Sequence, residues 1–234
     1  MGKTLAIDTS SYVMGIAVTD GTEILGEMTT NLKKNHSLRL VPAINMLLKE
    51  VDTKPAELER IVVAHGPGSY TGVRIGVTTA KAMAWSLHIP LVGVSSLEMQ
   101  AYAGRYFLGY ICPLIDARRG QVYTGLYQNE QGLIACQSAD RITLLSDWLA
   151  QLAVTKKQVL FIGQDVSLHQ EKIKEVLQEK AVFAAAASNL PRPGELAVAG
   201  LIKKADASIH SFVPQYLQLA EAEAKWKKAQ ENKE

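Results

Sequence analysis

Twelve residues, HGPGSYTGVRIG at positions 65–76, decide how this sequence folds. They follow an apolar stretch at 61–64 that reads as a buried strand, and they run into a helix predicted over 72–87. Their glycines allow tight turns, and either Ser69 or Thr71 is suited to cap the helix, whose free N–H groups would attract an anion. No Gly-Lys-Ser/Thr ends the loop, so it is not a Walker loop. A structural turn without a ligand is the alternative.

The helix after this loop carries a small residue every four positions, at Gly72, Gly76, Ala80 and Ala84. These residues lie along one face, which is therefore flat. Glycine at position 76 weakens a helix by ~1 kcal/mol relative to alanine, so a close contact should offset that cost. Small residues let a second helix approach closely. The pattern alone fits an interface with a partner and a crowded contact inside the protein almost equally well.

The elements around this loop occur in the same order twice. Expected strands lie at 4–8, 14–19, 23–30, 61–64, 91–94, 110–115, 121–127, 133–138, 159–162 and 181–186, and expected helices at 37–51, 72–87, 144–153, 166–179 and 194–205. The two halves are two β-β-β-α-β-α units. They predict an α/β protein of two lobes, built on mixed sheets with a cleft between them. One larger open sheet is the alternative.

This order divides the chain into three parts. An N-terminal lobe with the partner-binding helices is predicted at 1–104 and a C-terminal lobe at 105–213. A C-terminal extension follows at 214–234, and its last fifteen residues carry eight charges. That composition predicts a partly disordered tail. A segment that becomes ordered on a partner is the alternative.

An aspartate ends the first strand of each unit. The repeat predicts that Asp8 and Asp116 face each other across the cleft, although aspartate at a strand end is also a common turn former. Together with the glycine loop, these strand ends form a candidate ligand cleft. Its residues are Asp8, Thr9, Ser10, Gly66, Gly68, Ser69 and Asp116.

The composition is that of an average globular protein, with 47% hydrophobic and 21% charged residues in 234. A formal net charge of +2 does not by itself predict a nucleic-acid surface. Two cysteines make no disulfide framework, and no run of ~18 apolar residues predicts a membrane span, so we expect a cytoplasmic protein. The five histidines show no metal-ligand spacing. Ser69 lacks the Gly-x-Ser-x-Gly elbow of a hydrolase.

Three motifs closely resemble the TsaB (YeaZ) family: LAIDTS at 5–10, GPGSYTGVRIG at 66–76 and IDARRGQVY at 115–123. The segments PQY at 214–216 and EAE at 221–223 also resemble that family's end. The resemblance implies the two-lobed actin-like/Hsp70-like ATPase (ASKHA) fold. It implies a role in forming N6-threonylcarbamoyladenosine (t6A) at adenosine 37 of tRNAs that read codons beginning with A. In that role the chain is a non-catalytic subunit without a cofactor of its own, and ATP or ADP act only at the level of the complex.

The resemblance also names partners. They are a TsaD-like catalytic subunit that forms a heterodimer with this chain, a TsaE-like ATPase, and tRNA through the complex, while the lone chain is expected to form a homodimer and no membrane is involved. Catalytic relatives carry two metal-binding histidines, four residues apart, after an Ile-Pro-Leu-x-Gly-Val strand. Here the strand at 89–94 is followed by Ser96 and Gln100 at those positions, so no metal site is expected. Arg118 and Arg119 are candidates for direct tRNA contact.

The helices over 40–51 and 72–87 are the expected interface with the partner. The predicted contact residues are Leu40, Ile44, Leu47, Gly72, Val73, Gly76, Val77, Ala80 and Ala84. Two other functions stay open. One is an independent ATPase or peptidase that uses Asp8, Ser69 and Asp116. The other is a nucleotide-binding regulator whose cleft senses a ligand without turnover.

Overall fold

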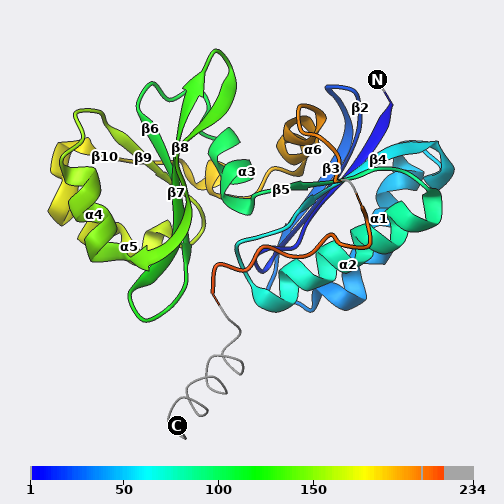
Figure 1. The fold of residues 1–234 in the computed structure, drawn as a ribbon, viewed down its shortest axis with the longest axis horizontal. Helices are drawn as coiled ribbons and strands as arrows, with labels where there is room; N and C mark the ends of the chain where they lie inside the picture. Colours follow the sequence, from blue (N-terminus) through cyan, green and yellow to red (C-terminus); the bar gives the residue numbers. More distant parts are fainter. Residues whose placement is uncertain (1, 207, 219–234) are drawn as a thin grey trace, which may run out of the picture.

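Two five-stranded mixed sheets organise the computed structural model, which describes residues 2–206 and 208–218 (Figure 1). Helices flank both sheets, as expected for a two-lobed α/β protein. Within the described residues, no helix is both long and apolar enough to cross a membrane.

The first sheet belongs to the N-terminal lobe. Its elements are β1 (Lys3–Asp8), β2 (Val13–Asp20), β3 (Glu23–Asn31), α1 (His36–Glu50), a short 3₁₀ turn (Pro55–Glu57), β4 (Leu58–Ala64), α2 (Tyr70–Leu87) and β5 (Leu91–Val94). The strand order is β3-β2-β1-β4-β5, with antiparallel pairs on the β3 side of β1 and parallel pairs on the β5 side. Gly21 adopts a φ of 56° in the hairpin between β2 and β3, where an Asp-Gly pair favours a tight turn.

The second sheet repeats this topology. Its elements are β6 (Tyr110–Asp116), β7 (Gln121–Glu130), β8 (Leu133–Leu144), α4 (Leu145–Ala153), β9 (Val159–Ile162), α5 (Val166–Leu177), 3₁₀ turns (Gln178–Lys180 and Ala186–Asn189) and β10 (Ala181–Phe183). The order β8-β7-β6-β9-β10 matches the first sheet strand by strand. The predicted repeat of β-β-β-α-β-α units is confirmed, and the alternative of one larger open sheet is wrong.

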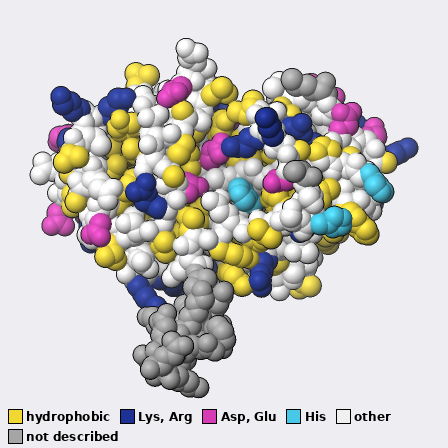
Figure 2. Space-filling view, in the orientation of Figure 1, with side chains coloured by type: hydrophobic (Ala, Val, Ile, Leu, Met, Phe, Trp, Pro, Cys, Tyr) yellow, Lys and Arg dark blue, Asp and Glu magenta, His cyan; other side chains and the backbone are white. Residues whose placement is uncertain are grey.

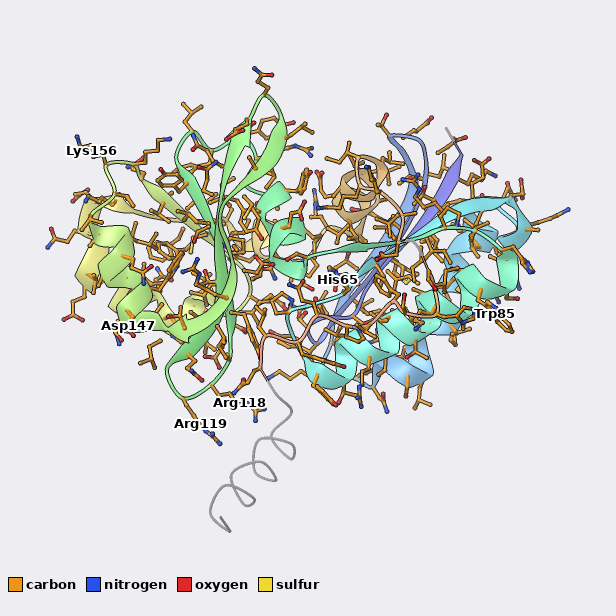
Figure 3. All side chains as sticks on the ribbon, in the orientation of Figure 1. His65, Trp85, Arg118, Arg119, Asp147 and Lys156 are labelled. Atoms are coloured by element: carbon orange, nitrogen blue, oxygen red, sulfur yellow. The ribbon has the colours of Figure 1, made fainter. Side chains whose placement is uncertain are left out.

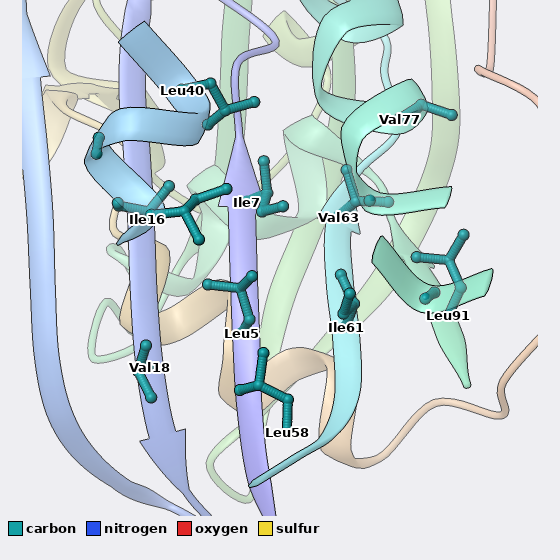
Figure 4. Packing of buried hydrophobic residues seen from close by; sticks show 14 of the residues in the cluster. Leu5, Ile7, Ile16, Val18, Leu40, Leu58, Ile61, Val63, Val77 and Leu91 are labelled. Carbon is teal, nitrogen blue, oxygen red and sulfur yellow. The ribbon is translucent and has the colours of Figure 1, made fainter. Parts of the chain in front are cut away.

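The central strands of the first sheet are buried on both faces, whereas the edge strand β3 is partly exposed. Leu5 and Ile7 of β1, with Val63 of β4, point to the side that α1 and α2 cover (Figure 4). The intervening residues Ala6 and Val62 point to the opposite side. Side chains alternate between the two faces of a strand, so a strand buried on both faces reads as a continuous apolar run.

In each half of the chain, one helix packs against the sheet of the other half. The helix α3 (Ser96–Tyr102) follows β5 but packs against the second sheet, where Leu97 contacts the hydrophobic cluster of Ile111. The helix α6 (Pro193–Leu201) follows the second lobe but returns to the first sheet, where Leu196 joins the cluster of Val62. Figure 1 shows both crossings. The predicted ranges 1–104 and 105–213 therefore assign these two helices to the wrong lobes, because the second face of each sheet is covered by a helix from the other half.

The C-terminal strap, residues 208–218, lies along the first lobe (Figure 1). Lys81 Nζ donates hydrogen bonds to the carbonyls of His210 at 3.0 Å and Phe212 at 2.7 Å. The Phe212 side chain is buried in the core of the first lobe, and the Gln215 N–H donates to the His65 carbonyl at 2.7 Å. The predicted boundary between 213 and 214 thus falls inside a packed segment. The predicted charged tail, residues 220–234, lies outside the described residues.

Candidate functional site: the cleft between the lobes

A cavity of about 830 Å³ lies between the two lobes. Its walls are the loops that follow β1, β3 and β4 in the first lobe and β6 and β9 in the second, and the strap closes one side. The carboxyl ends of parallel strands meet here in both sheets. Ligands bind at this place in open α/β sheets, so the cleft is the natural candidate for a site.

Four of the seven predicted cleft residues line this cavity. They are Ser10, Gly68, Ser69 and Asp116. The other three lie in the packing behind it: Asp8 is fully buried, Thr9 is 1% exposed, and Gly66 is pressed against the backbone of Gln215. The sequence motifs therefore predicted where the cleft lies, but only four of their seven residues form its surface.

The glycine loop before α2 is held by the turn after β1. The Ser69 N–H donates to the Ser10 carbonyl at 2.6 Å, and the Thr9 hydroxyl donates to the Gly72 carbonyl at 2.7 Å. A Cβ on either Gly68 or Gly72 would overlap the backbone of that turn. Ser69 caps α2, since its Oγ accepts from the Gly72 N–H at 3.3 Å, as the sequence predicted.

These contacts leave a poor fit for the phosphates of a nucleotide. The Ser69 N–H is engaged by Ser10, and the Ser10 N–H donates to Asp8 Oδ1 at 2.8 Å. The close approach that the glycines allow is used by the protein's own backbone. Close packing against the turn after β1 thus accounts for the glycines of the loop.

Asp8 lies beneath the cleft rather than in its wall. Its Oδ1 accepts from the N–H two residues on, which is an Asx turn. Its Oδ2 has no hydrogen-bond partner among the described residues. Burial raises the pKa of Asp8 above its usual range, against the opposing effects of the Ser10 hydrogen bonds and of His36. The prediction that Asp8 faces Asp116 across the cleft is wrong, because the carboxyl group turns inward to hold its own loop.

Asp116 does line the cleft, in a cluster with Asp165 and His169. His169 Nε2 lies 3.0 Å from Asp116 Oδ1, and the Asp116 N–H donates to Asp165 Oδ2 at 2.9 Å. Burial raises the pKa of Asp165 above its usual range. Sequence reasoning missed Asp165 and His169, because the start of α5 carries no motif and only the fold brings it beside β6.

The mouth of the cleft is basic on both sides. Lys33 and Lys34 line it from the loop between β3 and α1, and Arg118 and Arg119 line it from the hairpin between β6 and β7. We call these four residues the basic rim. Figure 3 shows the two arginines at the end of their hairpin. On the face seen in Figure 2, basic and acidic side chains are interspersed. The sequence singled out the arginines but not the lysines, whose only signal was their adjacency.

The two residues that the sequence resemblance aligned with the histidines of catalytic relatives, Ser96 and Gln100, both lie on α3. Ser96 is fully buried, and Gln100 is 6% exposed and lines the cleft. A hydroxyl and a neutral amide are poor ligands for iron or zinc. Among the described residues, no group of three or more His, Cys, Asp or Glu side chains is placed to hold a metal ion.

The predicted interface residues face the protein's own sheet. A Cβ on Gly76 would lie 2.5 Å from Thr9 Oγ1, so the small-residue face allows α2 to approach β1 closely. The prediction that this face contacts a partner is wrong, and the internal contact that the pattern also allowed is the one formed. The buried residues are Leu40, Ile44, Leu47, Gly72, Val73, Gly76, Val77, Ala80 and Ala84.

The outer surface of the same two helices is apolar as well. Leu38 is 75% exposed, Val41 58% and Met46 62% on α1, and Trp85 is 61% exposed on α2. We call these four residues the outer α1–α2 face. Trp85 stands at the far end of α2 in Figure 3. The two helices contact each other, so both contribute exposed apolar side chains to the outer surface of the first lobe.

Comparisons with known proteins agree with this fold. Residues 23–226 match the family model described as TsaD, tRNA N6-adenosine threonylcarbamoyltransferase. TsaB of Bacillus subtilis (strain 168) is 54% identical over 226 residues, which cover 97% of this chain and 98% of that protein. TsaB of Escherichia coli (strain K12) is 32% identical over 132 residues, 55% of this chain and 56% of that protein. The structure of YeaZ from Pseudomonas aeruginosa superposes with a TM-score of 0.78 at 24% identity, covering 93% of this chain and all of that chain.

The repeated sheets, the exchanged helices and the cleft between the lobes define a protein of the two-lobed actin-like (ASKHA) fold, related in sequence to the tRNA threonylcarbamoyltransferases. Within that class the chain belongs to the TsaB family of tRNA threonylcarbamoyladenosine biosynthesis proteins, as 54% identity over nearly its whole length shows. The resemblance carried by the three sequence motifs is confirmed.

Proposed function

We propose that this chain is a non-catalytic subunit of the machinery that forms t6A at adenosine 37 of tRNAs reading codons that begin with A. It acts with a TsaD-like transferase and a TsaE-like ATPase. The names of its relatives support the pathway. Ser96 and Gln100 support the non-catalytic role, since neither can replace a histidine ligand. The complex, rather than this chain alone, handles ATP or ADP.

The outer α1–α2 face carries this proposal. Leu38 and Met46 are more than half exposed, on a surface that the other described residues leave uncovered. Large apolar side chains exposed to water promote association with other molecules. Binding of a partner that covers them is therefore favourable. The docking site is thus the outside of the two helices that the sequence named, and not their inside.

The occupant of this face is the TsaD-like transferase. The chain matches the transferase family model over residues 23–226, so the two proteins share a fold and the partner has an equivalent pair of helices. Two such pairs pack as a four-helix interface in which apolar outer faces meet. When the partner is absent, a second copy of this chain takes its place and forms a homodimer.

A double charge substitution tests the docking face. Leu38→Glu with Met46→Glu should leave folding intact, because both side chains are exposed, but should abolish co-purification with the TsaD-like subunit. The matched control is Val154→Glu with Leu168→Glu, which places two charges at exposed apolar sites of the second lobe, 83% and 69% exposed. Equal co-purification of both double variants would refute the interface.

Reconstitution tests the function itself. The TsaD-like and TsaE-like proteins are incubated with tRNA, ATP and threonylcarbamoyl donor, with and without this chain, and t6A is measured in digested tRNA by mass spectrometry. We expect t6A only when this chain is present, and none when it replaces the transferase. Full activity in its absence would remove the proposed role.

A further inference from the structure

The basic rim brings together cations from both lobes at one opening. Lys33 and Lys34 come from the loop after β3, and Arg118 and Arg119 from the hairpin after β6, about eighty residues further along the chain. Among the described residues, the acidic side chains that line the same cavity are Asp116 and Asp165. Both carboxyl groups are engaged, since Asp116 bonds His169 and Asp165 accepts from the Asp116 N–H. Lys33, Lys34 and Arg118 are exposed, so the described surface of the mouth carries positive charge from both lobes.

The arginine hairpin keeps its charges at a conformational cost. Arg118 has a φ of 66° and Arg119 a φ of 54°, and Gly120 follows at 74°. Hairpin turns with positive φ at both central residues favour Asn-Gly, because side chains other than those of Asn, Asp and Gly are disfavoured in the left-handed region. A backbone outlier of this kind points to a use for the side chains it carries.

Aromatic rings alternate with the cations around the opening. Tyr12 is 37% exposed, and Lys33 Nζ lies 5.4 Å from the centroid of its ring. Tyr70 of α2 stacks on Tyr216 of the strap with ring centroids 4.8 Å apart, and Arg74 covers Tyr70 at 4.3 Å. All three tyrosines line the cavity. Cations interleaved with exposed aromatic rings are the surface on which single-stranded nucleic acid binds, with phosphates on the cations and bases stacked on the rings.

We propose that this chain contacts RNA directly, holding a single-stranded segment across the mouth of its cleft with the basic rim and Tyr12. The inference rests on the proposed function, in which tRNA is the substrate of the complex. The observations favour a strand over a free nucleotide. The cations sit on the exposed rim of both lobes, where a chain of phosphates can pass from one to the other, whereas the N–H groups of Ser10 and Ser69 on the floor are engaged internally.

The test uses the complex of this chain with the TsaD-like subunit and fluorescently labelled, unmodified tRNA, with binding followed by anisotropy across a salt series. Lys34→Gln with Arg118→Gln should weaken binding and reduce the slope of log Kd against log salt by about 1.4, at 0.7 per phosphate contact on a single strand. Lys156→Gln with Lys204→Gln removes the same charge at exposed sites outside the cleft and should leave the slope unchanged. Figure 3 shows Lys156 at the opposite end of the second lobe from Arg118. An unchanged slope in the rim variant overturns the inference.

A second variant separates stacking from charge. Tyr12→Ala should weaken binding of a short single-stranded RNA about five-fold or more, the effect of one lost base stack, while binding of duplex RNA of equal charge stays the same. Equal losses for both RNAs, or none, would contradict a single-stranded occupant. If saturating ATP displaces the RNA and the rim variants lose ATP binding instead, the occupant is a mononucleotide and the inference fails.

Failure of the inference and failure of the proposed function give different results. Rim variants that co-purify with the transferase and bind tRNA like the unmodified chain sink only the RNA contact. If the unmodified chain does not bind the transferase at all, the proposed function fails. The salt series on the lone chain, with the same variants, then still decides whether the rim binds RNA.

Discussion

Strands β1 and β6 occupy equivalent places in the two lobes, yet their final aspartates have different surroundings. Asp8 is fully buried and holds the turn that follows it. Asp116 lines the cleft and bonds His169. The turn after β1 folds inward against the glycine loop, whereas the turn after β6 stays exposed and carries Arg118. Strand order therefore sets where a loop begins, and the contacts of that loop decide whether its side chains reach solvent.

The helices of the two lobes differ in the same way. On its sheet side α2 presents Gly76 and Ala80, while α5 presents Ile173 and Leu177. On the solvent side α1 and α2 present the outer α1–α2 face, while α5 exposes charged residues such as Lys172. One topology thus supports two kinds of surface. The first lobe exposes Trp85 and Met46 on its two outer helices, whereas α5 of the second lobe exposes Leu168 beside charged residues.

The largest predicted change in the free energy of unfolding concerns the sheet-facing sides of α2 and α5. Gly76→Leu should destabilise the protein by about 3 kcal/mol or more, because even a Cβ there meets Thr9 Oγ1, which is itself held by a hydrogen bond to Gly72. Ile173→Leu, at a fully buried position of α5, keeps the volume and should cost less than about 1.5 kcal/mol. Urea unfolding measures both.

The control for this comparison is Thr78→Leu, on the exposed side of α2, which should change stability by no more than about 0.5 kcal/mol. If Gly76→Leu were as mild as this control, the close packing of α2 against β1 would be disproved.

A pH-dependent effect is expected from the contrast between Asp8 and ordinary aspartates. The pKa of Asp8 is raised by burial above the ordinary 3.8, so the folded protein binds its proton more tightly than the unfolded chain does. Its contribution to stability is full below about pH 3.8 and is lost as the pH rises through the raised folded pKa. Asp8→Asn removes this loss, so the variant should gain stability relative to the unmodified protein between pH 4 and 7.

Urea midpoints across that pH range measure the effect. Asp20→Asn, in the exposed hairpin between β2 and β3, is the matched control. Its urea midpoint should change with pH in the same way as that of the unmodified protein. A stability difference for Asp8→Asn that does not grow with pH would show that the carboxyl group is charged in the folded state.

The smallest predicted change in stability concerns the exposed turn after β6. Arg118→Asn should raise stability by less than about 1 kcal/mol, because asparagine tolerates the left-handed region better than arginine does. The same change should weaken RNA binding if the basic rim holds phosphate. Lys156→Asn, at an exposed site whose φ is not positive, should give no such gain in thermal unfolding. A loss of stability in Arg118→Asn would remove the argument that the turn is strained.

Most of the fold could be predicted, because its signals are local. The continuous apolar run of β1 and the helical spacing of α1 can be recognised from a few neighbouring residues. The predicted elements agree with the structure to within a few residues, except that β8 runs to Leu144 and that α3 was not among the expected helices. The repeat of order then implied two lobes. The assignments of α3 and α6 to lobes could not be predicted, since a helix at the boundary is apolar whichever sheet it covers.

The site could be predicted only in part. The motifs located the cleft, and Ser10, Gly68, Ser69 and Asp116 do line it. They missed Lys33, which lines the cleft from the loop after β3, and His169, which lies on α5 and bonds Asp116. Neither segment carries a motif of its own. Spacing along the chain shows which residues share an element, but it does not show which elements meet.

The sequence by itself determined the family, the two-lobed fold and the absence of histidines at 96 and 100, because residue identity and local periodicity suffice for these. Only the tertiary structure decided which way each face points. The small residues of α2 fit an internal contact as well as an interface, and Asp8 fits a cleft wall as well as a buried turn. Those choices depend on where the backbone of Thr9 and Ser10 lies against α2, and that distance is set by the packing of the whole lobe.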